Sequence, residues 1–160
     1  MAYNRQKAIE YAHRWAYDRN PRYANFDNMG GDCTNFISQC LYAGGCAMNF
    51  TPTFGWYFQS LRSRSPSWSG VEFLHTFLTT NRGPGPYGHD AAFEELEPGD
   101  LIQISFDGVH YGHCVLIVDV GPHLLPSDLR IAAHTFNSDN RAITTYICDH
   151  WRYLHIDGTR

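Results

Sequence analysis

The stretch that decides the fold of this 160-residue chain is residues 30–45, GGDCTNFISQCLYAGG. Apolar side chains recur in it at helical spacing, at Cys33, Phe36, Ile37, Cys40 and Leu41. Asp32 stands where a helix N-cap is expected, and Gly44-Gly45 supplies a C-terminal stop. We therefore expect an amphipathic helix over residues 33–43, with Cys33 in its first turn.

Cys33 stands at a position with chemical consequences. A helix N-terminus carries about half a positive charge and several unpaired N–H groups, which favour a thiolate over a thiol. Cysteines at such positions have pKa values of about 3.5 to 7.5, compared with about 8.5 for free cysteine. The sequence thus predicts that Cys33 is a nucleophile with a lowered pKa, supported by Asp32 as a helix cap. The alternative is that Cys33 is a core residue.

Composition and charge exclude several functional classes. No run approaches the roughly 18 apolar residues of a transmembrane helix, so we expect no membrane span. The formal net charge is −4 and no basic stripe is present. Nucleic-acid binding needs clustered Lys and Arg, so we expect no nucleic-acid partner. Aromatic residues make up 15% of the chain and either fill the core or line a groove for a peptide or glycan.

The five cysteines indicate neither a disulfide framework nor a zinc ribbon. Their number is odd and no CxxC pair occurs among Cys33, Cys40, Cys46, Cys114 and Cys148. A metal site built from His110, His113, Cys114 and His134 is disfavoured, because histidines three apart on a strand point to opposite faces. We expect no metal and no cofactor.

Helical patterns come first along the chain and strand patterns come second. Helices are expected at 4–17, 33–43 and 70–80, and strands at 100–106, 113–120, 129–136 and 143–156. Residues 81–90, with Gly-Pro-Gly-Pro at their centre, are expected to form a loop. This order indicates an α+β fold in which N-terminal helices pack on a small antiparallel sheet. The length fits a single domain over residues 1–160.

His113 is the strongest candidate for the base that activates Cys33. It opens an apolar strand behind Gly112, and a neutral imidazole there can accept the thiol proton and later protonate a departing amine. A third group must orient the imidazole. His134 on the next strand is the first choice for that role, and Asn137 and Asp139 are the second choices.

The oxyanion of a tetrahedral intermediate also needs hydrogen-bond donors. The backbone N–H of Cys33 can supply one, because it lies at the expected helix N-terminus. For a second donor we consider Tyr23 and Asn28, which lie in the loop before that helix.

Segments along nearly the whole chain resemble one bacterial family. They are Tyr3-Asn4-Arg5, Tyr11-Ala12, Trp15-Ala16, Arg19-Asn20-Pro21, Phe26-Asp27, residues 30–45, residues 51–56, residues 65–68, Gly99-Asp100, Gly112-His113 and Ala133-His134-Thr135. Together they resemble the Putative amidase domain family of Gram-positive bacteria, which is related to NlpC/P60 and papain-like cysteine hydrolases. Asp32-Cys33-Thr34 is also similar to the Asp-Cys-Ser lead-in of NlpC/P60 peptidases.

The resemblance implies a fold, an activity and roles for residues. It implies a papain-like, NlpC/P60-like fold, with Cys33 as nucleophile, His113 as base and His134 as the orienting residue. The implied reaction is hydrolysis of an amide or peptide bond, with a peptidoglycan stem peptide as one such substrate.

Two other functions use the same residues or the same fold. An acyltransferase would pass the acyl group from Cys33 to an amine, through a second entrance to the cleft. A non-catalytic module would use its aromatic residues to hold a peptide or glycan. Residues 1–7 contain no apolar signal-peptide core. The expected location is therefore the cytoplasm, unless the domain is exported by a signal outside this sequence.

Overall fold

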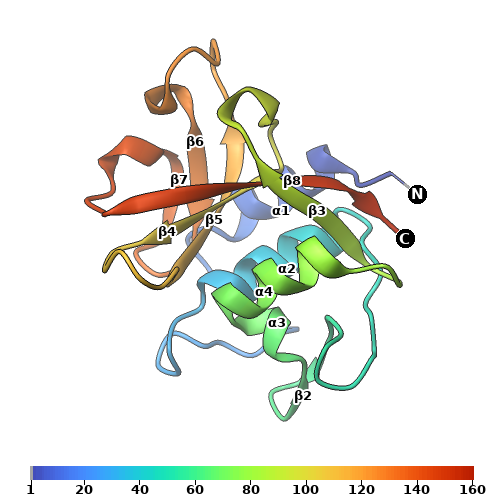
Figure 1. Ribbon diagram of the computed structural model, residues 1–160. Helices are drawn as coiled ribbons and strands as arrows, with labels where there is room; N and C mark the ends of the chain where they lie inside the picture. Colours follow the sequence, from blue (N-terminus) through green and yellow to red (C-terminus); the bar gives the residue numbers. More distant parts are fainter. Residues whose placement is uncertain (1) are drawn as a thin grey trace.

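The computed structural model describes residues 2–160 and shows an α+β fold (Figure 1). The helices are α1 (Arg5–Trp15), α2 (Cys33–Ala43), α3 (Pro66–Ser69) and α4 (Val71–Thr80), with 3-10 helices η1 (Phe93–Glu95), η2 (Pro126–Asp128) and η3 (Ile143–Thr145). The strands are β1 (Phe58–Ser60), β2 (Ser63–Arg64), β3 (Pro86–Ala91), β4 (Leu101–Ser105), β5 (His113–Asp119), β6 (Arg130–Ala133), β7 (Ser138–Ala142) and β8 (His150–Thr159).

Six of the strands form one antiparallel sheet in the order β3-β8-β4-β5-β6-β7, and β1 and β2 form a separate hairpin. Leu101 of β4 pairs with Leu116 of β5 on one side and with Leu154 of β8 on the other. The C-terminal strand β8 therefore lies inside the sheet, between β3 and β4. The expected small antiparallel sheet is confirmed.

The helices cover one face of this sheet (Figure 1). Helix α2 is central, because its residues from Cys33 to Leu41 are all buried. Two fully buried tryptophans pack beside it, and their indole N–H groups donate to polar side chains of α2: Trp56 to Ser38 and Trp68 to Asn35. Satisfying these donors internally allows large aromatic side chains to fill this core.

A second apolar cluster lies on the opposite face of the sheet. Strand residues such as Ile102, Ile104, Val115 and Ile117 belong to it, and Ile143 of η3 packs with them. Alternation along each strand produces this division, since neighbouring side chains point to opposite faces. Both faces of the central strands are consequently buried.

The expected helices are confirmed with small shifts of their ends. Asn4 caps α1, with its side chain accepting a hydrogen bond from the backbone N–H of Lys7. In the described residues, no helix has both the length and the apolar character that crossing a membrane requires.

Two expectations at the level of strands were wrong. Residues 81–90 are not wholly a loop, because Pro86–Ala91 forms the edge strand β3, with a register shift at Gly88. An edge strand tolerates proline and a bulge, which resemble loop signals in the sequence. The expected strand 143–156 begins only at His150, because residues 143–145 form η3.

Candidate active site

Cys33 opens α2 and lies against the start of β5. Its side chain is buried, with Sγ 3.7 Å from Oγ1 of Thr34. The backbone amides of Thr34 and Cys114 interact with the sulfur and favour its charged form. Burial outweighs them and raises the pKa of the Cys33 thiol above its ordinary value. The expectation of a lowered pKa was therefore wrong, because desolvation exceeds the effect of the hydrogen bonds to the sulfur.

Asp32 stands at the N-cap position of α2, but its side chain does not cap the helix. Its Oδ1 accepts hydrogen bonds from the backbone N–H of Phe26 at 2.8 Å and from Nδ2 of Asn35 at 2.9 Å. Gly31 before it has φ +104°, a conformation that favours glycine. Asp32 thus holds the preceding loop against α2, and the predicted capping role is replaced by this one.

His134 is buried between α1 and α2. Its Nδ1 lies 2.5 Å from Oδ2 of Asp32, and its Nε2 donates to the carbonyl of Trp15 at 2.7 Å. Its ring stacks on Phe36 with 4.0 Å between centroids. Both ring nitrogens are therefore occupied. The predicted orientation of His113 by His134 is not what the structure shows, because His134 instead ties Asp32 to the end of α1.

His113 is the first residue of β5 and is 4% exposed. Its Nε2 lies 3.3 Å from the hydroxyl of Tyr146, which follows η3. Burial, and then the positive charge of Arg141, lower the pKa of His113 to about 4. The imidazole is therefore neutral at pH 7, which is the form that a general base requires.

Cys33 meets the start of β5 from the side of the helices. His113 is the first residue of that strand, and its side chain points to the other face of the sheet. Cys114 faces the helices, whereas alternation places His113 on the face shared by Val115 and Ile117. No hydrogen bond joins Sγ to the imidazole among the described residues. Tyr146 connects the two groups, since it contacts His113 and interacts electrostatically with Cys33. The structure thus gathers Cys33, His113 and Tyr146 at this end of the sheet.

A cavity of about 420 Å³ opens beside His113. Its lining is mainly apolar and also contains one cation; the residues are Phe106, Gly112, His113, Thr135, Phe136, Arg141, Thr145, Tyr146 and Ile147. Cys33 does not line it. Phe106, Phe136 and Ile147 are exposed at its rim, as expected for a surface that meets a partly apolar ligand.

The remaining candidates from the sequence have other contacts. Asn137 accepts a hydrogen bond from Arg19 at 2.9 Å, and Asp139 lies 2.8 Å from Nδ1 of His13. Neither is hydrogen-bonded to His113. Tyr23 packs its ring on Trp68, and Asn28 is exposed in the loop before α2. Their role as oxyanion donors stays a prediction.

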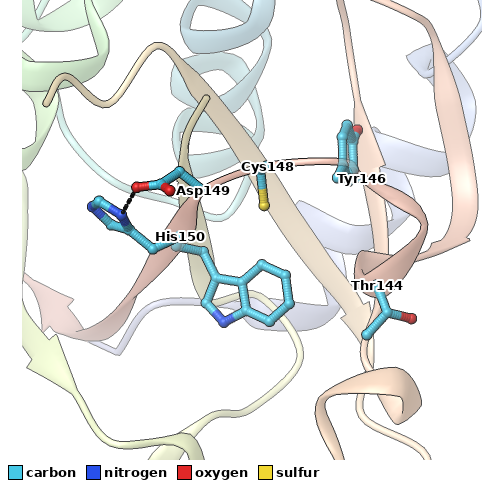
Figure 2. Close-up of a pocket in the computed structure, with 6 residues that line it drawn as sticks. Thr144, Tyr146, Cys148, Asp149 and His150 are labelled. Carbon is cyan, nitrogen blue, oxygen red and sulfur yellow. Dashed lines mark hydrogen bonds and ion pairs between the residues drawn. The ribbon is translucent and has the colours of Figure 1, made fainter. Parts of the chain in front are cut away.

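A second cavity, of about 490 Å³, shares Tyr146 with the first. Figure 2 shows the sulfur of Cys148 pointing into it, while Nδ1 of the neighbouring His150 lies 2.9 Å from Asp149. Burial and the negative charge of Asp149 raise the pKa of Cys148 above its ordinary value, as burial does for Cys33. Across residues 2–160, no three His, Cys, Asp or Glu side chains are grouped so that they could hold a metal.

Tyr146 and Arg141 are not predictable as site residues from the sequence. Both lie in the expected strand 143–156 or in the turn before it, and no spacing rule singles them out. The only available signal was the sequence Arg141-Ala142-Ile143-Thr144-Thr145-Tyr146, which places a cation and a phenol five residues apart after a turn.

The Putative amidase domain family matches residues 2–156. The chain belongs to this family. A relative, the "Uncharacterized protein YhbB" of Bacillus subtilis strain 168, is 35% identical over 143 residues, which cover 87% of this chain. The chain spans 43% of the length of that relative. No solved structure matches the chain. Family membership points to amide hydrolysis, and the papain-like fold stays a prediction.

Proposed function

We propose that the chain is a thiol-dependent amide hydrolase, with Cys33 as nucleophile, His113 as general base and Tyr146 as the residue that orients His113. The observation that carries this proposal is the placement of the α2 N-terminus. It holds the Cys33 sulfur against the backbone amide of Cys114. The residue before Cys114 is His113, a buried neutral histidine that lines a cavity. Burial raises the pKa of the thiol and lowers that of the imidazole, so the resting pair is uncharged.

The proposed reaction begins with proton transfer from the thiol to His113. Nε2 lies 3.3 Å from the hydroxyl of Tyr146, so we assign Nδ1 as the nitrogen that accepts this proton. The sulfur attacks the amide carbon, and the backbone N–H groups at the start of α2 stabilise the oxyanion. The imidazolium protonates the departing amine as the C–N bond breaks. His113 then deprotonates water, which attacks the thioester and releases the acid and the free thiol.

We extend the proposal to the peptides of the bacterial cell wall. The support is the similarity of Asp32-Cys33-Thr34 to the lead-in of NlpC/P60 peptidases, together with the bacterial relative. The apolar rim of the His113 cavity also suits an extended peptide better than a small ion.

Acyl transfer is a second candidate, and one specific observation favours it. The cavity around Cys148 shares Tyr146 with the His113 cavity, so an acceptor amine has its own approach to the same tyrosine (Figure 2). Added amine would then give an amide product in place of the acid.

The test is release of new amino groups from a mixture of peptides, including stem peptides from purified cell wall. We expect release by the wild-type protein, none by Cys33→Ala or His113→Ala, and normal release by Cys148→Ala as the matched control. In a second reaction, glycine amide is added as an acceptor amine. Products that carry glycine amide would favour the transferase. Equal release by the wild type and Cys33→Ala would overturn both, as would a complete lack of turnover.

A further inference from the structure

Arg141 is fixed in place at the edge of the His113 cavity. It lies in β7, and its Nε donates to Oγ1 of Thr145 at 2.7 Å. Its Nη2 donates to the carbonyl of Thr145 at 3.3 Å, and its Cζ lies 3.7 Å over the ring of Tyr146. These contacts orient the guanidinium before any ligand arrives, so little side-chain entropy remains to be lost on binding.

The charge of Arg141 has no carboxylate partner. Within residues 2–160, the ion pairs of Arg5, Arg19 and Arg152 each reach an Asp or Glu, and none is formed by Arg141. Other arginines without such partners lie outside this cavity. Arg141 is the one charged group among the residues that line it. A fixed cation in a mainly apolar cavity is a setting in which an anionic ligand is bound strongly.

The geometry points to a substrate that carries a carboxylate beside its scissile amide, and we propose that Arg141 binds this carboxylate. The inference rests on the proposed function, because it names the substrate class of the same site. The planar guanidinium matches the two oxygens of a carboxylate, and its hydrogen bonds among the described residues go to Thr145 and Ser138 and not to an acid. The apolar rim formed by Phe106, Phe136 and Ile147 would hold the adjoining part of the peptide.

Binding of the carboxylate also affects the base. The positive charge of Arg141 contributes to the low pKa of His113. A bound anion offsets that charge, so His113 becomes a stronger base when the acidic substrate is present. The same contact therefore contributes to both binding and catalysis.

The first arm of the test compares peptide pairs that differ only by Glu or Gln at the residue on either side of the cleaved bond. For the wild-type protein we expect kcat/KM for the Glu peptide to exceed that for the Gln peptide by roughly tenfold to hundredfold. Arg141→Gln should bring this ratio close to one, and Arg141→Lys should retain part of it. Taking the ratio cancels any general effect of the substitution on His113. The exposed Arg82, which follows α4, provides the matched control Arg82→Gln with an unchanged ratio.

The second arm does not depend on turnover. Alkylation of Cys33 by iodoacetate and by iodoacetamide is compared by mass spectrometry, with Cys148 of the same molecule as internal reference. We expect the ratio of iodoacetate to iodoacetamide rates at Cys33 to fall several-fold in Arg141→Gln and to stay unchanged at Cys148.

The two arms separate failure of the inference from failure of the proposed function. Hydrolysis without a Glu preference would overturn carboxylate recognition and leave the hydrolase standing. Absence of hydrolysis with an alkylation ratio that depends on Arg141 would remove the hydrolase and support anion binding. An alkylation ratio at Cys33 unchanged in Arg141→Gln and Arg141→Lys, with both variants folded by circular dichroism, would overturn the inference.

Discussion

Burial acts in opposite directions on the two reactive side chains. It raises the pKa of the Cys33 thiol and lowers that of His113 to about 4, because in each case the charged form loses hydration. The amides of Thr34 and Cys114 favour the thiolate but do not offset this loss. The thiol of Cys33 must therefore lose its proton during the reaction. A preformed ion pair at rest is not expected.

His113 makes the stability of the protein depend on pH in a defined window. Its pKa is about 4 in the folded protein and about 6.5 in an unfolded chain, so the unfolded state binds the proton first as pH falls. Stability that is fully present above about pH 6.5 is lost as pH falls toward 4, by at most ~3 kcal/mol. Urea unfolding from about pH 7 to 4.5 measures this loss. His113→Asn should lose less stability than the wild type over that range, and parallel curves would contradict the assignment.

Tyr146 supplies the contact that orients His113. Tyr146→Phe removes the hydroxyl 3.3 Å from Nε2 and keeps the ring under Arg141. We expect kcat to fall roughly tenfold with little change in KM, because ring orientation matters most in the transition state. The control is Tyr153→Phe, which removes a hydroxyl that accepts from Trp151 elsewhere on the same sheet face. An unchanged kcat in Tyr146→Phe would remove this role.

At the scale of elements, the N-terminus of α2 is fixed by contacts with other parts of the chain. Asp32 bonds the loop at Phe26, and His134, after β6, joins Asp32 to the end of α1 through the carbonyl of Trp15. A helix packed on a sheet can slide or tilt unless polar contacts fix its end. The position of Cys33 therefore depends on residues that do not touch the reacting atoms.

Removing His134 tests this anchoring. His134→Ala leaves a carboxyl oxygen of buried Asp32 without its nearest partner and a void beside Phe36. We expect a loss of about 2–4 kcal/mol in the free energy of unfolding, measured with urea. The control His150→Ala, at a half-exposed site, should lose less than about 1 kcal/mol. A similarly small loss in His134→Ala would show that α2 is held by other contacts.

The elements that sequence patterns predicted are those whose signals are local. Helix α2 was predictable because its apolar spacing and both ends lie within residues 30–45. Strand β3 was not, because Pro86 and Gly88 resemble a loop and its pairing with β8 joins residues such as His89 and His155, far apart in sequence. The candidate site likewise contains one feature with a local sequence signal and one that depends on distant residues. The position of Cys33 follows from its helix, whereas the contact of His113 with Tyr146 depends on how the chain returns after β7.

At the scale of the whole molecule, the first helix and the last strand meet at one buried carboxylate. Asp100 precedes β4 and is fully buried; it lies 2.7 Å from Nη1 of Arg5 in α1 and 2.7 Å from Nδ1 of His155 in β8. The backbone N–H of Ile156 also donates to it at 2.9 Å. This cluster ties the first helix to the last strand and so couples the helical layer to the sheet.

Loss of Asp100 is accordingly expected to affect the whole fold. Asp100→Ala removes the buried carboxylate that the guanidinium of Arg5 and the ring of His155 share, at a cost of about 3–5 kcal/mol. Thermal unfolding followed by both tryptophan fluorescence and far-ultraviolet circular dichroism would report a lower Tm with coincident transitions. Asp90→Ala, which removes an exposed carboxylate 2.8 Å from His75, serves as control with a small change. A Tm as high in Asp100→Ala as in the control would contradict this role.

The most direct test of the central claim is to trap the acyl group on Cys33. The protein is mixed with an activated ester such as p-nitrophenyl acetate, quenched in acid within seconds, digested and mapped by mass spectrometry. We expect an acetyl group on the peptide that contains Cys33, less of it in His113→Ala, and none there in Cys33→Ala. Acylation confined to Cys148, or absent from the peptide that contains Cys33 in the wild type, would contradict the claim that Cys33 is the nucleophile.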